Sequence, residues 1–129
     1  LDHHREVASR DTMGWESYPE GLHRVLVDLK RFRLPVMITE NGTCTDDDRN
    51  RWDFILGHVR MVAKAIQAGV PVLGYLYWSL LDNFEWARGF RPRFGLVEMD
   101  YVTQKRKVRE SAWQYAEICR SNRVATPED

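Results

Sequence analysis

Glu40 is the first residue whose surroundings suggest chemistry. It follows a short apolar run, Pro-Val-Met-Ile-Thr from Pro35 to Thr39, and stands directly before an Asn-Gly turn. A run rich in β-branched residues, without polar alternation, predicts a strand covered on both faces. In parallel α/β barrels the carboxyl ends of the strands build the active site, so a carboxylate here would point into it. Taken alone, however, the motif is better explained as a turn with a solvated glutamate.

A second apolar run changes that balance, because aromatic and acidic residues follow it closely. The run from Val70 to Trp78 ends in Tyr-Leu-Tyr-Trp and leads into Ser-Leu-Leu-Asp-Asn-Phe-Glu-Trp, residues 79–86. Aromatic rings stack on the C–H faces of a pyranose, and carboxylates and indole N–H groups bond its hydroxyls. Any one of Trp78, Phe84 and Trp86 is as easily explained as core. The cluster as a whole favours a sugar site.

Three helices are expected around these two strands. Ser17 and Glu20 form a capping-box pattern with Pro19 in the first turn, which predicts a helix ending near Arg33. The aspartates at 46–48 suit the start of a second helix, which Gly69 closes. The third helix ends at 121–122, and its apolar face is expected to carry Val108, Ala112, Tyr115, Ala116 and Cys119. Residues 79–101 are expected to form a long loop.

This order of elements indicates an α/β fold that is incomplete. Strands separated by helices pair in parallel through crossover connections. Two parallel strands with three helices leave open sheet edges, whereas parallel sheets are normally wide and covered. The chain therefore reads as a piece of a larger α/β sheet.

Composition excludes several classes of protein. The 19 basic residues balance 19 acidic ones, so the charge excess that would attract a nucleic acid is missing. No stretch approaches the roughly 20 apolar residues of a membrane helix, and the opening Leu-Asp-His-His-Arg lacks the apolar region of a signal peptide. Cys44 and Cys119 lie far apart in a sequence without disulfide-scaffold character, so both are expected to be reduced thiols in a cytoplasmic protein.

Several segments together resemble family 1 glycoside hydrolases, the family of many β-glucosidases. Residues 35–42, Pro-Val-Met-Ile-Thr-Glu-Asn-Gly, resemble the family's nucleophile strand, and residues 74–86 resemble the next strand with its sugar-binding loop. Further similar segments, in family order, are residues 13–22, 93–101 and 103–106. The resemblance covers residues 11 to about 122. It implies that residues 1–129 are the C-terminal portion of a single (β/α)8 TIM-barrel domain, about two strands and three helices.

The same resemblance implies roles for individual residues in retaining hydrolysis of β-glycosides. Glu40 would be the nucleophile. Trp78 would stack on the glycosyl unit, Glu85 would bind its 4- and 6-hydroxyls, Trp86 would donate to its 3-hydroxyl, and Phe94 would wall the pocket. Family members that act on 6-phosphorylated sugars replace the Glu-Trp pair, so an unphosphorylated glycoside is expected here.

One catalytic group is expected to be missing. A retaining glycosidase needs a second carboxyl group about 5 to 5.5 Å from the first. The family carries it in an Asn-Glu-Pro motif on an earlier strand, and that tripeptide does not occur in this sequence. The chain is therefore expected to need a complementary N-terminal barrel part or self-association, and to be inactive alone. Two alternatives stay open: a sugar-binding module without hydrolysis, and a structural fragment that self-associates.

The remaining candidates have ordinary explanations. His3 and His4 are expected at the surface rather than at a metal, and His58 is expected to be half-buried on a helix. The aspartates at 46–48 lack the alternating spacing of a calcium loop and are better read as a helix cap. No metal and no cofactor are expected. The arginines that could line the pocket entrance, or simply be solvated, are Arg88, Arg91 and Arg93.

Overall fold

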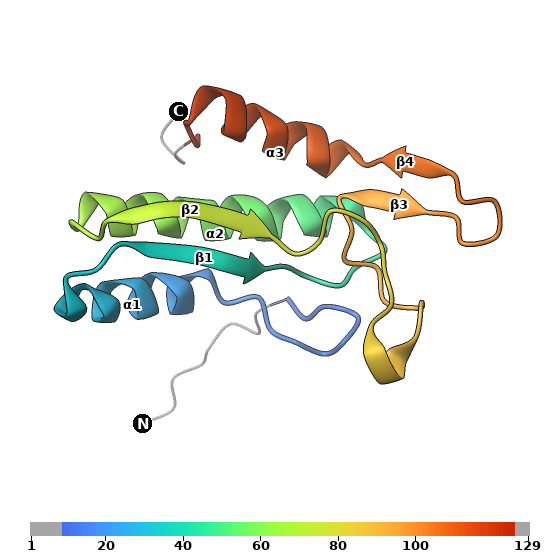
Figure 1. Ribbon diagram of the computed structural model, residues 1–129, viewed down its shortest axis with the longest axis horizontal. Helices are drawn as coiled ribbons and strands as arrows, with labels where there is room; N and C mark the ends of the chain where they lie inside the picture. The colour runs from blue at the N-terminus through green and yellow to red at the C-terminus, as the bar shows by residue number, and fades with distance from the viewer. Residues whose placement is uncertain (1–8, 126–129) are drawn as a thin grey trace.

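A parallel pair of strands lies against helices in the computed structural model, which describes residues 9–125 (Figure 1). Strand β1 (Val36–Asn41) and strand β2 (Val72–Tyr77) pair in parallel, with Ile38 opposite Tyr75 and Asn41 opposite Tyr77. The connection between them is helix α2 (Asp48–Gln67), which runs behind the sheet (Figure 1). The expected α/β alternation and parallel pairing are confirmed.

Helix α1 (Pro19–Leu29) begins differently from the expected capping box. Its N-cap is Tyr18, which makes no side-chain cap bond, and Pro19 takes the first helical position, where its missing N–H costs nothing. Ser17 is held instead by the preceding segment, because its N–H donates to the carbonyl of Ser9 at 3.0 Å. A 3₁₀ turn, η1 (Lys30–Phe32), extends the helix to Arg33. Arg33 adopts φ +54°, so the predicted end near this residue is confirmed.

Helix α2 begins and ends as its sequence predicts. Asp47 is the N-cap, and its carboxylate accepts the N–H of Arg49 at 2.9 Å. Beyond the C-terminus, Gly69 adopts φ +83°, the left-handed conformation that glycine supplies most readily at this position. The aspartate run is therefore a helix cap.

The segment expected to be a long loop contains further structure. It holds a 3₁₀ turn, η2 (Trp86–Arg88), and strand β3 (Val97–Met99), which pairs antiparallel with β4 (Arg106–Val108). Three-residue strands are too short for an alternating pattern, so the sequence carries little signal for this hairpin. Val108 therefore lies in β4, at 43% exposure, and not on the apolar face of helix α3 (Glu110–Ser121).

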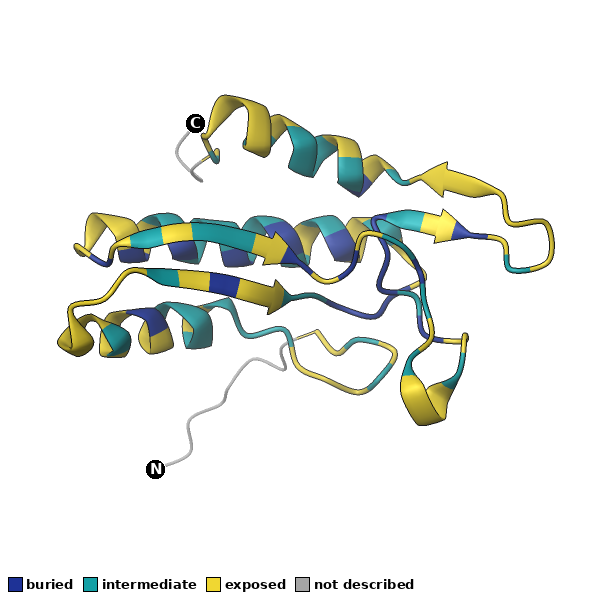
Figure 2. Ribbon diagram, in the orientation of Figure 1, coloured by how far each residue is buried: buried dark blue, intermediate teal, exposed yellow. Residues whose placement is uncertain are grey.

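The core forms between the helices and one face of the sheet. One cluster joins Leu26 of α1 and Ile38 of β1 to Val62 and Ala65 of α2. The second joins Ile55 of α2 to Tyr77, Leu96 and, partly buried, Tyr115 of α3. Parts of both β1 and β2 are coloured as exposed in Figure 2. The exposed large apolar residues of these strands are Met37 at 48%, Leu73 at 73% and Leu76 at 49%. Among residues 9–125, no helix is both long enough and apolar enough to cross a membrane.

Candidate active site

Glu40 and Trp78 both lie at the carboxyl ends of the paired strands. The N–H of Trp78 donates to the carbonyl of Asn41 at 3.0 Å, and the hydroxyl of Tyr75 donates to the Asn41 side-chain oxygen at 2.7 Å. Both Glu40 and Trp78 are exposed, Trp78 at 38%. Glu40 lies near the end of β1 and Trp78 directly after β2, which is the end of the sheet at which both residues were predicted.

Gly42 permits this close approach of the two strand ends. A Cβ built at residue 42 would overlap the carbonyl oxygen of Trp78. The glycine of the Glu-Asn-Gly motif is therefore more than a turn residue, because a side chain at this position would push Trp78 away from Asn41. Sequence patterns alone gave no sign of this contact.

Glu85 and Trp86 lie in a tight turn that follows β2, at the end of the molecule toward which β1 and β2 point (Figure 1). The Glu85 N–H donates to the Gly89 carbonyl at 2.8 Å, and the Arg88 N–H donates to the Glu85 carbonyl at 2.8 Å. Trp86 adopts φ +45°, which is unusual for a bulky residue and is the kind of local strain found at functional sites. Its side chain is 80% exposed, while Glu85 is half-buried.

Phe94 is buried rather than open in this chain. It is 4% exposed, and its ring centroid lies 6.1 Å from that of Trp15. The Ser79 N–H donates to the Phe94 carbonyl at 3.3 Å, which ties the segment after β2 to the segment before β3. Phe94 therefore packs inside this end of the molecule, against Trp15.

A buried carboxylate that sequence reasoning missed organises the same region. The Asp82 side chain is fully buried and accepts bonds from Arg109 at 3.0 and 3.1 Å and from Arg93 at 3.3 Å. It also accepts the N–H of Gly95 at 2.8 Å and that of Met99 at 3.3 Å. Burial raises the pKa of Asp82, but the bonds from Arg109, Gly95 and Met99 and the Arg109 charge lower it by more, so its pKa lies below the ordinary value. The spacing of Asp82 from its two arginines follows no pattern that would reveal the cluster.

A second cluster ties the segment before α1 to the segment after Glu40. The Asp11 carboxylate accepts the N–H groups of Met13 and Trp15, each at 2.9 Å, and that of Cys44 at 3.2 Å. The Thr12 hydroxyl lies 3.0 Å from the Cys44 carbonyl oxygen and 2.9 Å from its sulfur. Cys44 is a buried free thiol, and Cys119 is free and exposed. This cluster also was not foreseen from the sequence.

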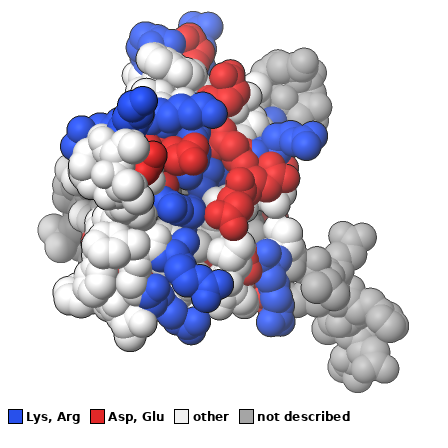
Figure 3. All heavy atoms as spheres, turned by 90° about the vertical axis from the view of Figure 1, so that its right-hand side faces the viewer, with Lys and Arg blue, Asp and Glu red and all other residues white. Residues whose placement is uncertain are grey.

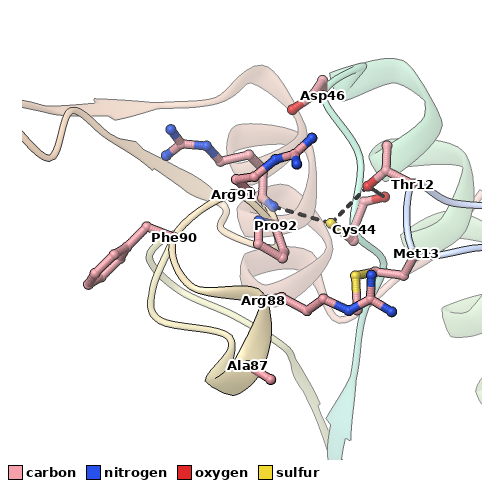
Figure 4. Close-up of a pocket in the computed structure, with 10 residues that line it drawn as sticks. Thr12, Met13, Cys44, Asp46, Ala87, Arg88, Phe90, Arg91 and Pro92 are labelled. Atoms are coloured by element: carbon pink, nitrogen blue, oxygen red, sulfur yellow. Dashed lines mark hydrogen bonds between the residues drawn. The ribbon is translucent and has the colours of Figure 1, made fainter.

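The arginines expected at a pocket entrance do line a pocket, shown in Figure 4. Its volume is about 810 Å³. The residues that line it are Thr12, Met13, Cys44, Asp46, Ala87, Arg88, Phe90, Arg91, Pro92 and Arg93. Neither Glu40 nor Trp78 belongs to this lining, so the pocket lies beside the predicted site. Basic and acidic side chains are interspersed over this end of the molecule (Figure 3), without a uniform field of one sign.

The remaining polar candidates have structural roles. His58 is 4% exposed, so it is more buried than expected; its Nδ1 lies 2.8 Å from the Phe54 carbonyl oxygen, and its ring stacks on that of Phe54. Burial lowers the pKa of His58. His3 and His4 lie outside the described residues. Across residues 9–125, no group of three or more His, Cys, Asp or Glu side chains could hold a metal ion.

Comparison with known proteins matches residues 2–124 to the family described as Glycosyl hydrolase family 1. The chain is 45% identical over 124 residues to a 1,4-beta-D-glucan glucohydrolase of Thermotoga neapolitana, covering 88% of this chain and 28% of that protein. It is 46% identical over 112 residues to a beta-galactosidase of Sulfolobus acidocaldarius, covering 86% and 23%. The solved family 1 b-glucosidase from Thermotoga maritima superposes with a TM-score of 0.88 at 41% identity, covering 98% of this chain and 30% of that one. The chain thus spans less than a third of the length of these proteins.

Proposed function

The chain belongs to glycosyl hydrolase family 1, and on that premise we propose that it supplies the nucleophile and part of the sugar subsite of a retaining β-glycosidase. The observation that carries the proposal is the position of Glu40. Glu40 is exposed near the carboxyl end of β1, and its neighbour Asn41 bonds to Trp78, which follows β2. That end of the strands is where TIM barrels build their active sites.

The proposed chemistry needs two carboxyl groups. The Glu40 carboxylate attacks the anomeric carbon and forms a glycosyl ester while a second carboxyl group protonates the leaving oxygen. The second group then takes a proton from water, which attacks the ester and releases the sugar with retained configuration. Glu85 is not assigned to this second role, because we propose that it binds the hydroxyls of the glycosyl unit.

The proposed substrate is an unphosphorylated β-glucoside or β-galactoside. Trp78 would stack on the C–H face of the sugar, and Glu85 and Trp86 would bond its hydroxyls. The matched proteins, described as a glucan glucohydrolase, a β-galactosidase and a β-glucosidase, support this class. We propose a cytoplasmic setting as well, with which the free thiols of Cys44 and Cys119 agree.

The proposed partner is a complementary N-terminal barrel part, in the same polypeptide or in another. Two features support it. The exposed apolar side chains of Met37, Leu73 and Leu76 lie on strands with open edges, a surface that a larger barrel would cover. The matched family proteins are also more than three times as long as the aligned segment.

The test is a hybrid barrel in which residues 9–125 replace the corresponding segment of the Thermotoga maritima family 1 β-glucosidase. We expect the hybrid to hydrolyse a chromogenic β-glucoside, and Glu40→Gln to lower kcat by about a thousandfold or more while sugar binding persists. In Glu40→Ala, added azide should restore turnover and give a glycosyl azide of inverted configuration, because one displacement replaces two.

The control is Glu98→Gln, an exposed glutamate of β3 that should leave the rate unchanged. A Glu40→Gln hybrid that keeps most of its rate would refute the assignment of the nucleophile. A folded hybrid that binds sugar without turnover would favour the alternative of a sugar-binding module.

A further inference from the structure

We propose that Asp82 is a positioning residue: by anchoring both ends of the 83–92 loop, it places Glu85 and Trp86 and so sets the selectivity of the sugar subsite. This inference rests on the proposed function, because it concerns the subsite that Glu85 and Trp86 are proposed to form. Asp82 would touch no substrate itself. Its effect would pass through the loop.

Asp82 is the point at which three segments of the chain meet, namely the start of the 83–92 loop, residues 93–99 and Arg109. Its carboxylate joins the start of the 83–92 loop to Arg93 at the other end of that loop, at 3.3 Å. It reaches the N-cap residue of α3 through Arg109, and the backbone before and in β3 through the N–H groups of Gly95 and Met99. Arg109 also donates to the Gly95 carbonyl, which closes the network. A fully buried carboxylate with two cationic partners is rigidly held, because any displacement leaves a charge unpaired.

The loop ends are aligned by backbone pairing on either side of this network. The Asp82 N–H donates to the Val97 carbonyl at 3.1 Å, and the Leu96 N–H donates to the Ser79 carbonyl at 2.8 Å. Gly95 is required at this crossing, because a Cβ there would overlap the backbone of Leu81 and Asp82. The two ends of the loop therefore have one arrangement in which both the backbone hydrogen bonds and those of the Asp82 carboxylate are formed.

The part of the loop with the proposed sugar ligands depends on these ends for its position. The backbone bonds of the Glu85–Gly89 turn described above run within the turn itself. Beyond the turn, Phe84, Phe90 and Tyr101 form a chain of ring contacts at 5.3 and 4.7 Å, and the Arg93 guanidinium lies 4.8 Å from the Tyr101 ring centroid. Arg93 thus links the aromatic contacts to Asp82. A shift of its guanidinium would disturb the ring contacts of Phe84 and Phe90, which flank the Glu85–Gly89 turn.

Asp82→Asn preserves the size of the side chain but removes its charge and replaces one acceptor oxygen by a donor. The amide N–H₂ cannot accept the bonds that one carboxylate oxygen now accepts, so Arg93 and Arg109 lose part of their pairing. Small misplacements of a binding group are costly to catalysis. We therefore expect kcat/KM to fall most for the substrates with the most hydroxyls that Glu85 binds.

The experiment uses the active hybrid barrel and two substrates, a β-galactoside and a β-D-fucoside, which differ in the 6-hydroxyl. Asp82→Asn should lower kcat/KM for the galactoside about tenfold more than for the fucoside, with Glu85→Ala as the reference for complete loss of that contact. Rates are measured well below the midpoint of thermal unfolding. The matched control is Asp47→Asn, which removes another carboxylate that accepts a backbone N–H bond, from Arg49 at the start of α2, and should leave the galactoside-to-fucoside ratio unchanged.

If Asp82 has only a structural role, Asp82→Asn would lower the melting temperature and the yield but leave the galactoside-to-fucoside ratio of kcat/KM within twofold of the parent. That result would overturn the proposal. An inactive, folded parent hybrid would refute the proposed function instead. Amide hydrogen exchange then tests the positioning role separately. Faster exchange of residues 83–92 in Asp82→Asn, with α2 unchanged, supports the role, and unchanged exchange in the loop overturns it.

Discussion

Replacing Asp48 with alanine should destabilise the chain more than its place in a helical first turn suggests. Its carboxylate accepts from the side chain of Arg51 at 2.6 Å, from the Ser111 N–H at 2.8 Å and from the Ser111 hydroxyl at 2.7 Å. One side chain of α2 thereby caps the start of α3, 63 residues away in sequence. Asp48→Ala removes all three bonds at once.

The magnitude is set mainly by Arg51. Its side chain is 0% exposed, and its Nε atom already has no partner. Breaking a buried ion pair from one side costs about 3–5 kcal/mol, because the other charge is left uncompensated. Asp48 itself is 28% exposed, so water can reach the vacated position and the lower end applies. Losing the cap on α3 costs about 1 kcal/mol more. We expect a loss of about 4 kcal/mol in the free energy of unfolding.

The assay is urea unfolding at one fixed protein concentration, followed by far-ultraviolet circular dichroism. With a slope of about 2 kcal/mol per molar urea, the midpoint should fall by about 2 M. Asp53→Ala is the matched control, since Asp53 is an exposed residue of α2, and its effect should stay within about 0.5 kcal/mol. Arg51→Met in the Asp48→Ala background should recover part of the loss by removing the orphaned charge. A loss below about 1 kcal/mol, or no recovery in the double variant, would refute the reasoning.

Three further predictions concern Gly42, the two aspartates Asp48 and Asp82, and the isolated chain. Gly42→Ala should cost about 3 kcal/mol of stability, because the added Cβ would overlap the Trp78 carbonyl. Gly74→Ala should be close to neutral, because its added Cβ meets only the flexible side chain of Met37. Equal effects of the two variants in urea unfolding would contradict this prediction. Asp48 and Asp82 both have pKa values below the ordinary one, so each contributes stability above about pH 4 that is lost as pH falls through its folded pKa. Asp82→Asn should therefore flatten the decline of unfolding free energy measured from pH 5 to pH 2. A slope equal to that of the parent would count against this expectation. The chain alone should show no β-glucosidase turnover, because its sequence has no Asn-Glu-Pro motif to supply the second carboxyl group. It should not stay a monodisperse 15.2 kDa monomer in light scattering, because its two-stranded parallel sheet exposes apolar side chains; a clean, active monomer would refute both points.

Local patterns in the sequence were sufficient for the main elements. The apolar runs 35–39 and 70–78 predicted two parallel strands, and the aspartates at 46–48 and Gly69 marked the two ends of α2. Strands and helix ends are determined by residues close in sequence, through hydrophobic periodicity, helix caps and glycines with positive φ. Resemblance of the same segments to a known family also identified the candidate site residues.

Only the tertiary structure decided the contacts that hold those residues in place. The carboxylate of Asp82 meets arginines 11 and 27 residues away, and that of Asp48 caps a helix 63 residues away. Gly42 is required by a strand end that follows it by 36 positions. The partners in such contacts have no regular spacing in the sequence, because the tertiary fold and the intervening helices bring them together. Sequence patterns therefore identified the side chains of the proposed site, and the long-range packing of the chain determined what positions them.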